Sequence, residues 1–160
     1  MSLPPPLPTT EECLEMRRLC ANFQLRRAAR QLTGAYDRHL AGVGLTAAQL
    51  PILAALRAGA GSSVGRLASV LDLDHSTLSR NLALLARKRL VRLQVGEDRR
   101  SRSVEMTASG EEALARGFRR WREVQDALEQ AIPRQRLDAG FGFVRDLVTA
   151  TGAEPPADEG

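Results

Sequence analysis

Residues 74–90 read "DHSTLSRNLALLARKRL" and decide how the chain is interpreted. Leu78, Leu82 and Leu85 follow one another at intervals of four and three, so in a helix they share one face, which we expect to be core. The opposite face carries Ser76, Thr77, Arg80, Asn81, Leu84 and Lys88. The stretch therefore predicts an amphipathic helix, which Asp74 is suited to cap.

A second helix is expected just before it, because Ser63 can cap a short helix that ends near Leu71. Two helices joined by about three residues make a helix-turn-helix. Residues 90–107, "LVRLQVGEDRRSRSVEMT", alternate apolar and polar side chains on both sides of a basic turn that contains glycine. This pattern predicts a two-stranded hairpin with residues 96–100 at its tip, and a short strand is expected near Ser62.

The N-terminal part predicts two helices. "TTEE" at residues 9–12 has the spacing of a capping box, and neither proline nor glycine follows until Gly34, so one helix is expected from about Glu11 to Leu40. "TAAQ" at residues 46–49 repeats the capping pattern, so the second helix is expected from there to about Leu56. Pro51 would then come late for a proline of the first turn.

The C-terminal part predicts two further helices. Thr107 or Ser109 can start a long helix, which Pro133 ends. Proline is favoured at the first position of a helix, so Pro133 is also expected to start the last one, which runs to about Thr151. The fold class is therefore mainly α with one small β-hairpin.

The polar face of the 74–90 helix has two interpretations. In the DNA major groove, arginine can pair with guanine O6 and N7, and asparagine with adenine N6 and N7. Serine, threonine, arginine and asparagine are also ordinary on any solvated helix face. The basic hairpin favours DNA, because it adds Arg99, Arg100 and Arg102 as contacts to an adjacent minor groove or to the backbone. Asp98 would pair with Arg100 and orient it; alternatively, the loop merely balances its charges.

The charge distribution agrees weakly with a polyanionic partner. The chain holds 22 arginines and one lysine, and residues 61–110 carry nine basic and five acidic side chains. Residues 111–160 carry seven basic and ten acidic ones. A basic middle segment favours nucleic acid, although many solvated surfaces are equally basic.

Three stretches together resemble the MarR (multiple antibiotic resistance regulator) family of winged helix-turn-helix repressors. They are "GLTAAQLPILAAL", "SSVGRLASVLDLDHSTLSRNLALLARKRLVRL" and "EDRRSRSVEMTASGEEAL", and the similarity extends over roughly residues 20–150. The resemblance implies a bacterial transcriptional regulator with a winged helix-turn-helix at residues 46–110. It also implies a dimerisation region formed by residues 1–45 and 111–152, with a disordered tail at 153–160.

The resemblance also implies how DNA is read. Ser76, Thr77, Arg80 and Asn81 would enter the major groove, and Arg100 of the wing would enter the minor groove. Lys88 lies on the same polar face, and we count it as a further DNA contact. A two-fold dimer should read an inverted repeat with half-sites on the order of 10 base pairs apart.

Two positions depart from the family pattern. Arg89 stands where relatives often have glycine, which suits a left-handed helix end. Either Arg89 adopts that conformation at a cost of up to about 1 kcal/mol, or the helix ends differently. Leu84 stands where relatives commonly carry a polar or basic side chain, and it is expected either to meet a thymine methyl group or to pack near the wing.

Regulation is open between a ligand and oxidation. The family often releases DNA on binding small aromatic or phenolic acids, and candidates to receive a carboxylate are Arg17, Arg18, Arg26, Arg27 and Arg30. Some relatives sense peroxide, so Cys13 and Cys20 offer a redox alternative. Seven residues span about 10.5 Å of helix, beyond the roughly 7 Å that a disulfide allows, so an intact helix keeps the two thiols apart. They can equally be small apolar fillers.

Other function classes find little support. His39 and His75 belong to no metal-binding pattern, and neither a nucleophile elbow nor a phosphate-binding glycine loop occurs, so we expect no enzyme, metal or cofactor. No apolar run approaches the roughly 18 residues of a membrane span, so we expect a cytoplasmic protein. The remaining alternative is a helical interaction module of this architecture that does not bind DNA.

Overall fold

The structure is a computed structural model that describes residues 6–59, 63–95 and 102–152. The chain divides into two units, residues 1–35 and 36–160.

The first unit contains α1 (Thr10–Leu19) and most of α2 (Ala21–Leu40). Thr9 and Glu12 form the predicted capping box. The single helix predicted for this region is wrong, because Cys20 adopts an extended conformation and separates two helices. The side-chain amide of Gln24 donates to the carbonyl oxygens of Arg17 and Arg18, at 2.9 and 3.2 Å. The Gln24 amide thus supplies hydrogen bonds to two carbonyl groups at the end of α1 whose helical N–H partners are lost at the break.

The second unit starts with the end of α2, followed by the 3-10 helix η1 (Ala41–Val43) and α3 (Leu50–Arg57). The predicted start of α3 at Thr46 is wrong. Residues 47–49 form a turn whose first N–H, that of Ala47, donates to the Asp37 carboxylate at 2.7 Å. Because α3 starts at Leu50, Pro51 lies in its first turn, where a missing N–H costs no helical hydrogen bond.

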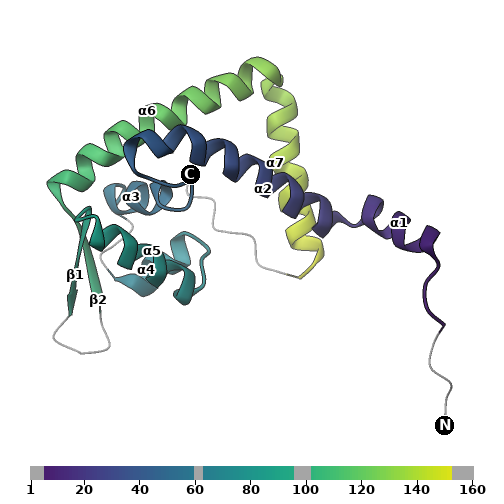
Figure 1. The fold of residues 1–160 in the computed structure, drawn as a ribbon, viewed down its shortest axis with the longest axis horizontal. Coiled ribbons are helices and arrows are strands. Elements are labelled where there is room, and N and C mark those ends of the chain that lie inside the picture. The colour runs from purple at the N-terminus through teal and green to yellow at the C-terminus, as the bar shows by residue number, and fades with distance from the viewer. Residues whose placement is uncertain (1–5, 60–62, 96–101, 153–160) are drawn as a thin grey trace, which may run out of the picture. The chain divides into compact units, whose positions relative to one another are not determined.

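The helix-turn-helix and the hairpin are confirmed. Ser63 caps α4 (Val64–Val70) and Asp74 caps α5 (His75–Arg87). Strands β1 (Val91–Val95) and β2 (Arg102–Met106) pair antiparallel, and Figure 1 shows them beside α4 and α5. Ser62, near which a short strand is predicted, lies outside the described residues, and the neighbouring Ser63 forms an isolated β-bridge with Ser103.

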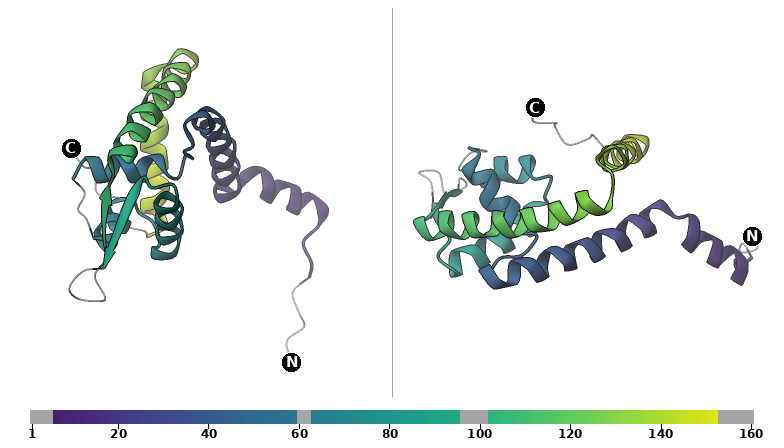
Figure 2. Two further views of the ribbon diagram at one scale, coloured as in Figure 1. Left: turned by 60° about the vertical axis from the view of Figure 1, so that its left-hand side comes forward. Right: turned by 90° about the horizontal axis from the view of Figure 1, so that it is seen from above.

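Two long helices complete the second unit. Thr107 caps α6 (Ala108–Ala131), and α7 (Arg134–Ala150) follows Pro133, which is its N-cap rather than its first residue. In Figures 1 and 2, α6 starts beside the hairpin. The close packing of the start of α6 against the two ends of the hairpin requires glycine at position 110. A Cβ there would overlap the carbonyl oxygen of Leu90 and lie 2.7 Å from Cγ of Met106.

The hydrophobic core of the second unit packs the helix-turn-helix and the hairpin against the helices around them. Its fully buried large side chains are Leu40, Ile52, Leu53, Leu67, Leu78, Leu82, Leu85 and Val104. All three leucines of the predicted core face of α5 are among them. The face of α5 opposite to these leucines is thereby held outward.

Candidate nucleic-acid interface

The outer face of α5 carries the predicted DNA contacts. Ser76 and Arg80 are exposed, and Thr77 and Asn81 are half-buried. Arg80 forms no hydrogen bond or ion pair with any other described residue. Its guanidinium therefore remains available to a ligand. Leu84 also faces outward, with 39% of its surface exposed.

The N-terminus of α5 is organised by one carboxylate. Asp74 accepts a hydrogen bond of 2.8 Å from the backbone N–H of Thr77, one of 2.6 Å from the Thr77 hydroxyl, and one from the Ser76 hydroxyl. These donors stabilise the ionised form and hold the pKa of Asp74 far below its ordinary value. From the sequence alone, Asp74 is predicted only as a helix cap. The spacing of "DHST" could have indicated its link to both hydroxyls.

Asn81 lies one turn further along the same face. One amide hydrogen of its side chain is donated to the carbonyl oxygen of Thr77 at 3.0 Å. This contact holds the Asn81 side chain against the helix backbone one turn from the residue that Asp74 caps.

Lys88 follows α5 and its ammonium group turns inward. It donates to the carbonyl oxygen of Gly44 at 2.8 Å and to Oε1 of Gln49 at 3.0 Å. Gln49 is only 2% exposed. The structure therefore separates Lys88 from the other predicted DNA contacts. No local pattern indicates this pairing, because the partners lie 44 and 39 residues away.

The wing is anchored at its base. Arg89 has a φ of 59°, the left-handed conformation expected at this position, and the Thr107 hydroxyl donates to its carbonyl oxygen at 2.7 Å. At the tip, Asp98, Arg99 and Arg100 lie outside the described residues. Arg102 is the first residue of β2, but its side chain also lies outside what the structure describes.

The candidate regulatory side chains of α1, α2 and the residue between them are accessible. Cys13 is exposed, Cys20 is half-buried, and both are free thiols. Exposed arginines of these helices are Arg17, Arg18, Arg26, Arg27 and Arg30. Among the residues that the structure describes, no three His, Cys, Asp or Glu side chains gather to hold a metal ion. Within the same ranges, no helix is long and apolar enough to cross a membrane.

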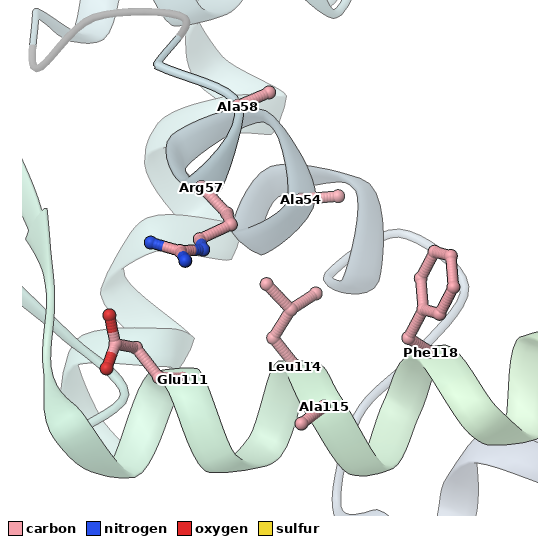
Figure 3. A pocket seen from close by; sticks show the side chains of 7 residues that line it. All are labelled: Ala54, Arg57, Ala58, Glu111, Leu114, Ala115 and Phe118. Atoms are coloured by element: carbon pink, nitrogen blue, oxygen red, sulfur yellow. The ribbon is translucent and has the colours of Figure 1, made fainter.

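A cavity of about 660 Å³ lies between α3 and α6. Figure 3 shows Arg57 from α3 and Glu111 from α6 near one end, with Leu114 in the middle and Phe118 at the other end. The lining is completed by Ala54, Ala58 and Ala115. No residue pattern predicts this site, because α3 and α6 are brought together only by the tertiary fold.

Comparison with solved structures identifies a DNA-bound relative. The M. tuberculosis transcriptional regulator MosR in complex with DNA is 35% identical, with a TM-score of 0.72 over 82% of this chain and 98% of that one. An E. coli MarR mutant in complex with operator DNA has a TM-score of 0.73 at 18% identity, covering 83% and 96% of the two chains. The S. aureus MepR–DNA complex has a TM-score of 0.69 at 18% identity, covering 82% and 96%.

The sequence profile of the MarR family matches residues 43–101, which include α3, α4, α5 and β1. Comparison with curated proteins gives no match. The likeness to MosR extends over nearly all of that protein at 35% identity, beyond the segment matched by the profile. The chain therefore belongs to the MarR family of DNA-binding transcription regulators.

Proposed function

We propose that the chain is a homodimeric repressor that binds an inverted-repeat operator in the cytoplasm and is released by a small ligand. The observation that carries the proposal is the arrangement of α5, in which Leu78, Leu82 and Leu85 are buried while Arg80 on the other face is exposed and unpaired with any described side chain. A helix held in this way can enter a major groove without disturbing the core.

The proposed contacts follow the outer face of α5 and the wing. Ser76, Thr77, Arg80 and Asn81 would meet base edges, while Arg100 would enter the minor groove and Asp98 would orient it. Arg99 and Arg102 would contact phosphate. This assignment rests on side-chain chemistry, because arginine suits guanine and phosphate, and asparagine suits adenine.

Uncovered apolar side chains support the homodimer. None of the residues of α1 or α7 is buried. Phe141 and Phe143 of α7 are 59% and 60% exposed, and Leu14, Met16 and Leu19 of α1 are also exposed. Large apolar side chains gathered on a surface favour burial against another protein. A second copy that pairs these helices would cover them and place two copies of α5 on one DNA.

The cavity between α3 and α6 supports a ligand of the aromatic acid class. Its volume of about 660 Å³ lies within the ordinary range for small-molecule sites. The Phe118 ring offers an apolar surface and Arg57 a cation for a carboxylate. A ligand would release DNA only if it bound the DNA-competent and incompetent states with different affinity.

Duplex DNA binding tests the core of the proposal. The affinity for duplex DNA should fall steeply as salt rises from 50 to 200 mM, because phosphate contacts release counterions. Selection of bound fragments from the native genome, followed by footprinting, should show two protected half-sites about one helical turn apart. A monomer in solution that protects one half-site would exclude the dimeric mode, and absence of binding at low salt would favour the interaction-module alternative.

Two free, accessible cysteines favour thiol-based redox sensing as a second candidate for regulation. The backbone N–H of Cys20 still donates a helical hydrogen bond to the carbonyl oxygen of Met16, so Cys13 and Cys20 of one chain stay about 10.5 Å apart and any disulfide would join two chains. Titration of thiols before and after peroxide treatment, with DNA binding measured in parallel, tests this candidate. Cysteines that remain unreactive while DNA binding is unchanged would assign both residues a packing role.

A further inference from the structure

Two hydroxyl groups at the exposed N-terminus of α5 point their protons at the same acceptor. The Ser76 hydroxyl donates to Oδ1 of Asp74, and the Thr77 hydroxyl donates to Oδ2 at 2.6 Å. Oδ1 also accepts the backbone N–H of Thr77 at 2.8 Å, which fixes the position of the carboxylate at the helix end. Asp74 therefore touches both predicted base-reading hydroxyls and holds them in one arrangement.

This arrangement determines what the hydroxyls can offer to a ligand. A serine or threonine hydroxyl has one proton to donate and two lone pairs that accept. An ionised carboxylate can only accept, so contact with it consumes the proton. With both protons directed at Asp74, the two side chains present lone pairs to any group that approaches from solvent.

We propose that Asp74 fixes Ser76 and Thr77 as hydrogen-bond acceptors, so that this end of α5 selects bases with an amino group in the major groove. Those bases are adenine, through N6, and cytosine, through N4. Guanine O6 and thymine O4 are acceptors and would face the hydroxyl lone pairs. The inference rests on the proposed major-groove function of α5 and adds the chemical class of base that its first turn reads.

Asp74 acts here as a positioning residue, because it works through the two hydroxyls. The depressed pKa of its carboxyl group is consistent with this role, since the acceptor stays ionised throughout the neutral pH range. Each base pair carries an amino group on only one strand in the major groove. The selection therefore decides the orientation of the pair, A·T against T·A or C·G against G·C.

The test is selection of bound sequences from a random duplex library by the full chain and four variants. Thr77→Val, which lacks the hydroxyl, identifies the position that Thr77 reads, because the preference there should disappear. Thr77→Ser should retain it. At that position the unaltered protein should favour adenine or cytosine by about fivefold, the lower end of the usual cost of a mismatched base pair.

Asp74→Asn provides the decisive variant, because asparagine caps helices as well as aspartate does. Its carbonyl oxygen can still accept the Thr77 N–H, while its amide nitrogen replaces the oxygen that receives the Thr77 proton. The hydroxyl must then turn its proton outward, so the preference at this position should reverse to guanine or thymine. Asp72→Asn is the matched control, because it removes the same charge from an exposed, left-handed residue that asparagine tolerates. It should leave the preference unchanged.

The outcomes distinguish failure of this inference from failure of the proposed base reading on which it rests. No enriched sequence with the unaltered protein would overturn the proposed base reading, and the inference with it. Enrichment whose base preference is the same in the unaltered protein and in Asp74→Asn would overturn the inference alone. A general gain in affinity shared by Asp74→Asn and Asp72→Asn, without reversal, would assign Asp74 a purely electrostatic role and would also overturn it.

Discussion

The ammonium group of Lys88 donates a 2.8 Å hydrogen bond to the carbonyl oxygen of Gly44, 44 residues earlier in the chain. Gly44 ends η1 with a left-handed φ of 72°, and the same ammonium reaches Gln49 just before α3. The residue that follows α5 is thereby tied to the turn that leads into α3. This tie fixes the C-terminal end of α5 as Asp74 fixes its N-terminal end.

Replacing Lys88 with methionine should lower stability and leave the salt dependence of DNA binding unchanged. The side-chain stem remains, but the nearly buried Gln49 loses a donor, which should cost about 1–2 kcal/mol in urea unfolding. A phosphate contact would instead reduce the salt slope by about one. Arg87→Met, at the exposed neighbouring position, is the control and should keep its stability. Unaltered stability of Lys88→Met with a reduced slope would return Lys88 to the DNA contacts.

Much of the fold could be predicted because its signals are local. Ser63, Asp74 and Thr107 cap helices through contacts three residues away. The spacing of the three core leucines of α5 is enough to predict that they share one face. The break at Cys20 lacks glycine and proline and depends on the side chain of Gln24. The start of α3 depends on Asp37, ten residues earlier. These interactions depend on the fold, and residue pattern does not reveal them.

The candidate site divides in the same way. The exposure of Arg80 follows from the periodicity of its own helix. The inward turn of Lys88 does not, because a helical wheel places it on the polar face while its partners come from a distant turn. The residue types of Ser76 and Thr77 show that each carries a hydroxyl group. The direction in which each hydroxyl donates its proton depends on the position of Asp74 in the folded helix end.

Replacing Arg80 and replacing Arg99 should have different effects on the affinity for DNA. Arg80→Ala should reduce binding to the selected operator by 1–3 kcal/mol while leaving binding to random duplex nearly unchanged, because a bidentate contact to guanine is lost. Arg99→Ala should weaken both DNAs alike, as loss of a phosphate contact does. Competition binding on the two DNAs measures the difference. Equal losses on both DNAs for both variants would contradict the assignment.

The cavity between α3 and α6 should bind an aromatic acid through Arg57. Salicylate serves as the probe in equilibrium dialysis, and Arg57→Gln should weaken its binding about tenfold through loss of a charge-assisted hydrogen bond. Arg66→Gln is the control, because Arg66 is exposed on α4 and does not line the cavity. Identical salicylate affinity in both variants would exclude Arg57 as the carboxylate partner.

Gly110 should tolerate no side chain. A Cβ at this position would overlap the carbonyl oxygen of Leu90, and backbone cannot give way as a flexible side chain does. Gly110→Ala should therefore destabilise the chain by about 3 kcal/mol or more in thermal unfolding. Gly65→Ala is the control within a helix, because nothing lies within 4 Å of the added carbon. It should gain up to about 1 kcal/mol, since alanine favours helix over glycine.

Arg89 should be the position where glycine stabilises the chain. A non-glycine residue at a φ of 59° carries a conformational cost of roughly 1 kcal/mol, and the hydrogen bond from Thr107 uses only the backbone carbonyl of Arg89. Arg89→Gly should therefore raise the free energy of unfolding by up to about 1 kcal/mol. Arg87→Gly, at the last residue of α5, should instead lower it, because glycine disfavours the helical conformation. Opposite signs two residues apart in urea unfolding would show that the left-handed turn, and not the loss of an arginine, sets the stability at the base of the wing.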